Sequence, residues 1–345
     1  MDASRIIDTH THVLTEEMIG LLRREAPKVA PRLTPIDGDS AILEVDGTPY
    51  RPFPRGGWDL ERRLRDMAAA EVDMQVLSAT PQTYLYGAEA SLAHACAVIQ
   101  NDQIAKLVAA APDRFLGIAT LPMQDPERAA AELRRAVQVR GLRGAMIGSN
   151  VVGRNLDHPS FEPLWAAAAA LDALIFIHPA NVAGADRLTA YYLNNLIGNP
   201  LATTIAAACL VFGGVLERHP GLKVLLVHGG GFVPYQAGRW VHGWKVRPEP
   251  KVHLDKSPEP WIARFYYDTI LHSVENLQFL VGAAGPTRVL LGSDYPYDMG
   301  TGECVRQVRA LSIPDADKAT VLGAQAWSLL GGSGVSPPRA EAAAP

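Results

Sequence analysis

The sequence of 345 residues is poor in cysteine, and its three cysteines, Cys96, Cys209 and Cys304, are far apart. An odd number of widely spaced cysteines predicts neither a disulfide framework nor a cysteine-rich metal site, and it is typical of a protein in a reducing compartment. The first residues also lack a basic stretch followed by an apolar one, so no secretory signal is expected. We therefore predict a cytoplasmic location.

Strong charge and long apolar runs are lacking as well. The formal net charge is −4 and no basic cluster stands out, so neither nucleic acid nor a membrane is expected as a partner. The longest apolar stretch, from Ile205 to Leu216, is too short to span a bilayer. With 48% hydrophobic and 20% charged residues, the composition is that of a globular protein with a large core.

Short apolar runs alternate with helical sequence along most of the chain. This pattern predicts eight strands, at residues 6–12, 73–79, 115–121, 143–147, 173–177, 223–227, 264–271 and 288–292. Eight such units predict an α/β fold, a (β/α)8 TIM barrel, as a single domain over residues 1–331. A doubly wound open sheet is the competing fold, but Gly229 to Gly231 lacks the spacing of a dinucleotide-binding fingerprint.

Two segments depart from this alternation. Residues 14–58 are rich in proline and glycine, and Asp46-Gly47 lies between two β-like runs, which is a strong hairpin signal. We interpret this segment as a small inserted flap after the first strand, with Arg51 on the second arm of the hairpin. The tail, residues 332–345, consists mainly of Gly, Ser, Pro and Ala and is expected to be disordered.

Candidate metal ligands follow several predicted strands directly. His10 and His12 alternate along the first strand, so their side chains point the same way, about 7 Å apart. His178, His228 and Asp294 come directly after the fifth, sixth and eighth strands. Taken singly, each of two residues has an equally good structural explanation: His178 as a buried histidine hydrogen-bonded to the backbone, and Asp294 as a helix N-cap. Together they meet at the carboxyl-terminal face of a barrel, where catalytic residues lie.

This set of ligands indicates one divalent metal ion. Three neutral imidazoles and a carboxylate suit Zn²⁺ best, with Mn²⁺ also possible, and one coordination position must stay open for water or substrate.

The motifs as a set resemble the amidohydrolase superfamily, and within it the decarboxylase branch typified by 2-amino-3-carboxymuconate-6-semialdehyde decarboxylase. The matching motifs are Asp8 to His12, His178-Pro179, His228 to Gly231 and Gly292 to Pro296. The resemblance implies metal ligation by His10, His12, His178 and Asp294. It also implies that His228 activates the metal-bound water and transfers protons, and that Arg51 and Arg239 hold the substrate carboxylate. In that family the second arginine comes from the other subunit, which implies a homodimer.

Two features refine this expectation. Binuclear amidohydrolases usually carry a carbamylated lysine at the end of the fourth strand, but residues 145–150 read Ala-Met-Ile-Gly-Ser-Asn, so a single metal is expected. Tyr191 and Tyr297 stand where relatives carry bulky Trp and Phe, and we interpret both as substrate-binding candidates, with simple packing as the alternative.

The predicted activity is a metal-dependent, nonoxidative decarboxylation of an unsaturated or aromatic carboxylic acid. Loss of CO2 leaves an electron pair on carbon, and the enzyme must stabilise this pair and then protonate the carbon. Two alternatives stay open. One is a mononuclear metal-dependent hydrolase or hydratase of a related carboxylated compound, and the other is a noncatalytic barrel that only binds metal or a partner.

Overall fold

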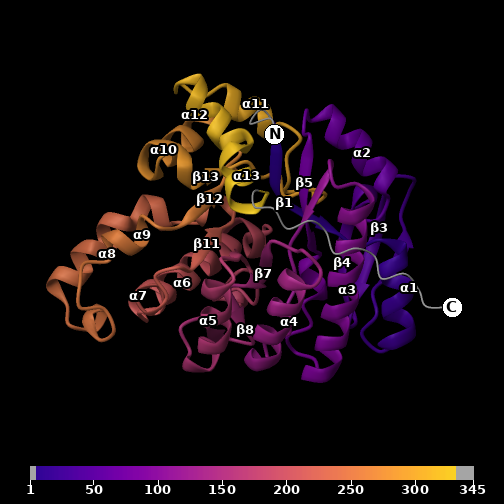
Figure 1. Ribbon diagram of the computed structural model, residues 1–345, viewed down its shortest axis with the longest axis horizontal. Helices are drawn as coiled ribbons and strands as arrows, with labels where there is room; N and C mark the ends of the chain where they lie inside the picture. The colour runs from indigo at the N-terminus through magenta and orange to yellow at the C-terminus, as the bar shows by residue number, and fades with distance from the viewer. Residues whose placement is uncertain (1–4, 332–345) are drawn as a thin grey trace.

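The computed structural model describes residues 5–331, and its core is a ring of parallel strands (Figure 1). A three-stranded sheet in the order β1-β5-β6 and a five-stranded sheet in the order β13-β12-β11-β10-β7 supply the ring. Parallel bridges from Ala119 to Ala145 and from Thr11 to Tyr295 join the two sheets at both junctions. At the second junction His12 N also donates to Tyr295 O at 2.7 Å. The fold is therefore the predicted (β/α)8 barrel.

The barrel strands are buried along almost their whole length, which explains their continuous apolar sequence. They are β1 (Ile7–Val13), β5 (Met74–Ala79), β6 (Phe115–Gly117), β7 (Gly144–Gly148), β10 (Leu174–His178), β11 (Lys223–Leu226), β12 (Tyr266–Asp268) and β13 (Val289–Leu290).

Three strands end well short of the predicted ranges, namely β6, β12 and β13. At the ends of β12 and β13, side chains take the place of ladder hydrogen bonds. Asp268 Oδ1 accepts from Ile270 N at 3.2 Å, and Thr269 Oγ1 accepts from Gly292 N at 3.1 Å. The apolar pattern continues through these residues because they stay buried, although the regular pairing has ended.

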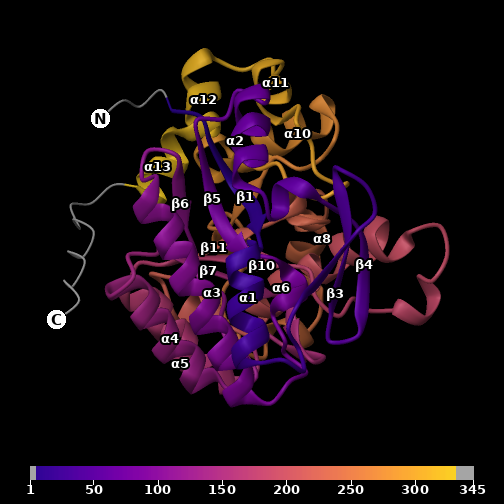
Figure 2. The ribbon, with the colours of Figure 1, turned by 90° about the vertical axis from the view of Figure 1, so that its right-hand side faces the viewer.

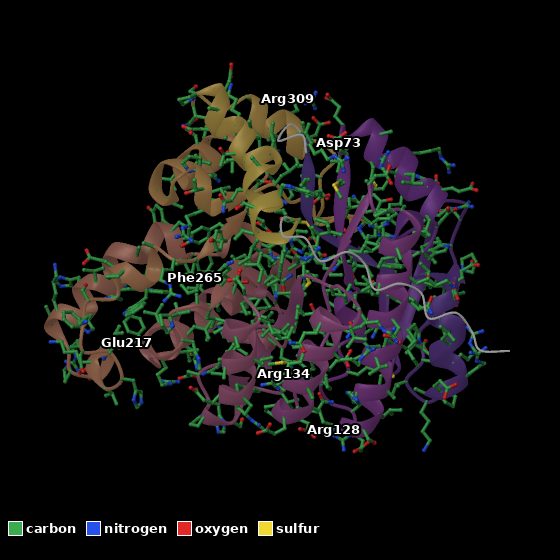
Figure 3. All side chains as sticks on the ribbon, in the orientation of Figure 1. Asp73, Arg128, Arg134, Glu217, Phe265 and Arg309 are labelled. Carbon is green, nitrogen blue, oxygen red and sulfur yellow. The ribbon has the colours of Figure 1, made fainter. Side chains whose placement is uncertain are left out.

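Helices surround the ring, and charged side chains such as Arg128 and Arg309 lie at the periphery of the molecule (Figure 3). The sequence predicts a helix from Asp125 to Val139 with Asp125 as its N-cap. The start of α4 (Pro126–Gln138) confirms this cap, because the Asp125 side chain accepts from Arg128 N and Pro126 is the first helical residue. The helices after the flap are α2 (Leu60–Ala69), α3 (Ala90–Ala110), α4 (Pro126–Gln138), α5 (Glu162–Ala170), α6 (Asn199–Phe212), α7 (Val215–Arg218), α8 (Val233–Val246), α9 (Glu259–Ile262), α10 (Val274–Ala284), α11 (Cys304–Arg309), α12 (Asp315–Ala319) and α13 (Gln325–Leu330).

The sequence predicts a helical region from Arg187 to Glu217 with a break near Pro200, and the structure differs from this prediction. A π-helical segment, η5 (Asn194–Gly198), passes directly into α6, so the expected break near Pro200 does not occur. Together they form a helix of 19 residues that is long and apolar enough to cross a membrane, with a mean hydropathy of 1.5. The expectation that no stretch reaches that length was therefore wrong. This is weak evidence for a membrane span, because helices that cover a barrel pass the same test, and one face of α6 is buried.

The flap contains the predicted hairpin. β3 (Ser40–Val45) and β4 (Thr48–Pro54) pair antiparallel, and Asp46 and Gly47 both have positive φ at the turn. The segment also holds two elements that the sequence analysis did not predict, α1 (Glu16–Glu25) and a third strand, β2 (Arg32–Pro35), which pairs with β3. Figure 2 shows β3 and β4 on one side of the barrel, with α3, α4 and α5 along the other. The predicted disordered tail, residues 332–345, lies outside the described residues.

Candidate metal centre

Four predicted ligands converge at the carboxyl-terminal ends of the barrel strands. His10 and His12 on β1, His178 at the end of β10 and Asp294 after β13 are buried, and their ligand atoms lie within 4.8 Å of one another. The Nε2 atoms of His10 and His12 are 3.1 Å apart. Asp294 Oδ1 lies 3.5 Å from the first of these nitrogens and 3.3 Å from the second. Four donors at these separations are close enough to share one cation.

Hydrogen bonds at Nδ1 set the tautomers of His10 and His178. His10 Nδ1 lies 2.8 Å from Asp268 Oδ2, and His178 Nδ1 lies 3.1 Å from Pro179 O. Both acceptors lack a proton to give, so each histidine donates through Nδ1. The Nε2 atoms are left to face the centre with their lone pairs, as in metal sites where a carboxylate or carbonyl orients the imidazole.

His12 reaches the same state through a hydroxyl. Ser78 Oγ donates its proton to Thr11 O at 2.8 Å, so it can only accept from His12 Nδ1, which lies 3.0 Å away. The His12 Nε2 lone pair therefore faces Asp294.

The charges in this site fit a cation. Asp294 Oδ1 is buried and has no hydrogen-bond donor among the described residues. Burial would raise the pKa of Asp294, but the adjacent histidines His12, His228 and His10 hold it well below its usual value. Burial lowers the pKa of His12 to about 4 and the pKa of His178 well below its usual value. Neutral imidazoles beside an ionised carboxylate form the protonation state that metal binding requires.

His10 differs from the other two histidines in its proton affinity. Burial disfavours its charged form, yet the hydrogen bond to Asp268 and the charge of Asp294 together raise its pKa. A proton and a metal ion compete for the same Nε2 lone pair, so His10 is the ligand at which that competition is strongest.

Asp268 is the main residue of the site that the sequence analysis missed. Besides His10 Nδ1, its carboxylate accepts from the backbone N–H groups of His228 at 2.9 Å and Gly229 at 2.8 Å. It therefore holds one ligand and the turn that carries the proposed acid–base histidine. The available signal was a carboxylate at the end of an apolar strand, between Tyr267 and Thr269.

His228 lies beside the four ligands on a tight turn. It has φ 55° and begins η6 (His228–Gly230), and its Nε2 atom is 3.5 Å from Asp294 Oδ2. Its ring centroid is 5.4 Å from that of His10 and 5.6 Å from that of His178. The side chain lines the cavity described below, so it can exchange a proton with a bound molecule.

A cavity of about 590 Å³ opens above the ligands. One wall contains His178, His228 and Asp294, and the flap residues Thr48 and Tyr50 also contribute to the lining. The remaining polar residues of the lining are uncharged apart from Asp298, namely Gln82, Tyr84, Tyr86, Asn181, Tyr192, Asn194, Asn195, Asn199 and Tyr297. The size suits a small organic molecule.

The two predicted tyrosines have different positions. Tyr297 lines the cavity, its ring centroid lies 5.1 Å from that of His12, and its hydroxyl donates to Gln82 Oε1 at 2.6 Å. Tyr191 is 87% exposed and does not belong to the lining, whereas its neighbour Tyr192 does. The sequence pattern could not separate two adjacent tyrosines in a loop.

Neither predicted arginine reaches the cavity within one described chain. Arg51 lies on β4 with an exposed side chain, and Arg239 lies exposed on α8. No arginine or lysine belongs to the cavity lining in residues 5–331. The structure thus brings together the metal ligands, His228 and Tyr297, and leaves the two arginines and Tyr191 on the surface of the single chain.

Comparison with known proteins gives consistent relatives. A family model described as amidohydrolase matches residues 7–331. A 2-amino-3-carboxymuconate-6-semialdehyde decarboxylase of Dictyostelium discoideum is 37% identical over 329 residues, which are 94% of this chain and 91% of the relative.

Solved structures agree in fold. A 5-carboxyvanillate decarboxylase from Sphingomonas paucimobilis matches with a TM-score of 0.80 and 26% identity, over 95% of this chain and 99% of that one. A dihydroxybenzoic acid decarboxylase from Polaromonas sp., solved with manganese and the inhibitor 2-nitroresorcinol, matches with a TM-score of 0.77 and 25% identity, over 94% and 96% of the two chains. Because the family model spans nearly all described residues, including the four ligands and His228, this chain belongs to the amidohydrolase family.

Proposed function

We propose that this protein is a metal-dependent, nonoxidative decarboxylase of an unsaturated or aromatic carboxylic acid. The observation that carries the proposal is a mononuclear centre of three histidines and one aspartate, with a further histidine beside it that is not needed as a ligand. Relatives that decarboxylate an aminocarboxymuconate semialdehyde, a carboxyvanillate and a dihydroxybenzoate support the reaction class.

The residues divide the chemistry between them. A divalent ion held by the four ligands would act as a Lewis acid. His228, which faces the cavity, holds the proton that the substrate carbon takes up when CO2 leaves. Asp294 shares the centre and lies 3.5 Å from His228 Nε2, so a counterion is in place while that imidazole carries the proton.

One metal ion per chain is the expected content. The end of β7 continues through Ser149 and Asn150, and neither can take the part of a carbamylated lysine. A set of three imidazoles and one carboxylate suits Zn²⁺, whereas manganese is present in the Polaromonas relative. We propose Zn²⁺ as the resident ion, with Mn²⁺ as the ion most able to replace it.

A homodimer would complete the cavity. The cavity lining of the described chain lacks a cationic side chain, while Arg51 on the flap and Arg239 on α8 are exposed. α8 and α9 reach away from the ring (Figure 1), and Tyr235 and Val246 on α8 are exposed. Exposed apolar side chains on a projecting element favour a subunit interface. We propose that Arg239 enters the partner's cavity and binds a substrate carboxylate there, together with Arg51.

The remaining assignments are proposals of the same kind. Tyr297, which lines the cavity, would contact the substrate, whereas the position of Tyr191 outside the lining does not support the same role. The free cysteines, of which Cys96 and Cys304 are buried, agree with a reducing cytoplasm.

The deciding experiment has two parts. Metal analysis of the purified protein should give about one divalent ion per chain. A screen of aromatic and muconate-type carboxylates should then give CO2 with at least one compound. Ring opening, water addition or hydrolysis of a lactone or amide, with no CO2 from any member, would establish the hydrolase or hydratase alternative instead.

A further inference from the structure

Arg63 on α2 is the largest charged side chain that the structure buries completely. Its guanidinium donates to His12 O, to Gln75 Oε1 at 2.8 Å and to Thr11 Oγ1 at 3.4 Å. On another side it lies over the ring of Tyr295, 4.8 Å from the centroid. Arg63 therefore contacts the end of β1 and the residue that follows Asp294, although it touches no ligand side chain itself.

A second set of hydrogen bonds extends from Gln75 to the opposite side of the centre. Gln75 Nε2 donates to Asp8 Oδ2 at 3.3 Å. The Asp8 carboxylate in turn accepts from Ser293 Oγ at 2.5 Å, from Ser293 N at 3.0 Å and from His10 N at 3.2 Å. Arg63, Gln75, Asp8 and Ser293 thus form one buried chain of contacts, named here the Arg63 network. It connects the backbone of His10 with that of the residue before Asp294.

The charges explain why this network is rigid. No carboxylate of residues 5–331 is in direct contact with the Arg63 guanidinium, so this buried cation depends on each hydrogen bond it makes, because water cannot replace a lost one. Burial lowers the pKa of Arg63 only to about 10, so the side chain stays cationic at neutral pH. The guanidinium group is planar and its N–H groups have fixed directions. The two acceptors, His12 O and Gln75 Oε1, are therefore fixed relative to each other.

We infer that Arg63 is a positioning residue of the metal centre. It holds the end of β1 and the turn from Ser293 to Tyr295 in the spacing at which His10, His12 and Asp294 can share one ion. This role goes beyond the ligands and their hydrogen-bond partners, and it rests on the proposed metal dependence but not on the identity of the substrate.

The test measures Mn²⁺ affinity directly, in the absence of any substrate. Metal-free wild type, Arg63→Met and Arg63→Lys would be titrated with Mn²⁺ by calorimetry, and the bound ion examined by electron paramagnetic resonance. Loss of an outer contact that orients ligands weakens metal binding by about 10–100-fold. We expect this loss for Arg63→Met, with an altered Mn²⁺ spectrum. Arg63→Lys keeps the charge but lacks the planar arrangement of N–H donors. We therefore expect it to regain the melting temperature lost in Arg63→Met, but only part of the lost Mn²⁺ affinity.

Arg264 provides a matched control at a distance from the centre. It is a partly buried arginine whose Nη1 donates to Leu216 O at 2.9 Å and whose Nη2 donates to Leu222 O at 3.0 Å. Arg264→Met should lower the melting temperature and leave Mn²⁺ affinity unchanged. Should Arg63→Met fail to fold, Arg63→Lys decides the question. Wild-type Mn²⁺ affinity and spectrum in the folded Arg63 variants would overturn the inference, and would leave the decarboxylase proposal standing.

Discussion

Asp268 accepts a hydrogen bond from His10 Nδ1 at 2.8 Å, and the same carboxylate binds the backbone N–H of His228 at 2.9 Å. A single buried side chain on β12 therefore orients a candidate metal ligand from β1 and the turn that carries the proposed acid–base histidine. The same carboxylate thus contacts both the candidate metal centre and the turn of the proposed proton donor, although 218 positions of sequence separate His10 from His228.

Replacing Asp268 with Asn should weaken metal binding. The amide keeps the shape of the side chain but removes the negative charge, and its NH2 group cannot accept from His10 Nδ1. We expect metal affinity to fall by about 10–100-fold, measured by calorimetric titration of the metal-free protein. Unchanged affinity would mean that Asp268 acts only on the His228 turn.

His228→Ala should separate metal binding from catalysis. His10, His12, His178 and Asp294 already supply four ligands, so the His228 variant should keep about one metal ion per chain by elemental analysis. Its turnover should fall by about 10²–10⁴-fold, the usual contribution of a positioned acid–base group. If the metal content fell together with turnover, His228 would be a ligand and the division of roles proposed above would be wrong.

Removal of the metal should destabilise the fold locally and reversibly. Without the cation, the lone pairs of His10, His12 and His178 face an ionised Asp294 in a buried site. Adding metal at a hundredfold excess over its Kd should stabilise the chelator-treated protein by about 2.7 kcal/mol. Thermal melts at increasing Zn²⁺ or Mn²⁺ concentration would measure this, and a melting temperature independent of both ions would contradict the proposed site.

A mixed dimer tests whether Arg239 acts across an interface. Arg239→Ala and His228→Ala should each be inactive alone. In a randomly mixed dimer of the two variants, one cavity keeps both His228 and the partner's Arg239, so mixing should restore about a quarter of wild-type activity. Mixing a double variant, carrying both substitutions, with wild type provides the control for subunit exchange. No recovery despite exchange would place Arg239 outside the partner's cavity.

Tyr297→Phe tests the cavity wall next to His12. The substitution removes the hydroxyl that donates to Gln82 Oε1 and retains the ring. We expect a loss of about 1 kcal/mol in the free energy of unfolding, together with a higher KM and the same metal content. Tyr191→Phe is the matched control, because that side chain is exposed and outside the cavity lining. An unchanged KM in the Tyr297 variant would reduce its role to packing.

Much of the fold was predictable because it depends on local pattern. Buried parallel strands require continuous apolar runs, and a turn with positive φ at Asp46 and Gly47 requires residues that tolerate that conformation. The sequence pattern predicted element boundaries poorly in two places. After Asp268, side chains replace the backbone hydrogen bonds of the strand, and before Pro200 a π-helical segment continues directly into α6. In the flap, β2 is too short for a pattern to show, whereas α1 was missed although Met18, Ile19 and Leu22 share one helical face and Thr15 caps its first turn.

The sequence by itself determined the candidate metal ligands. In a parallel barrel every strand ends at the same rim, so residues that directly follow strands must come together wherever they stand in the chain. His10, His12, His178, His228 and Asp294 all satisfy that condition.

Only the tertiary structure decided which residues support those ligands and which reach the cavity. Asp268 and Arg63 act through contacts between distant elements, and no spacing in the chain reports such contacts. Tyr192 lines the cavity and Tyr191 does not, because side-chain direction in a loop depends on backbone angles that neighbouring elements impose. The physical reason is the same in each case: the position of a strand along the chain is encoded by local sequence, whereas the surroundings of a side chain follow from tertiary packing.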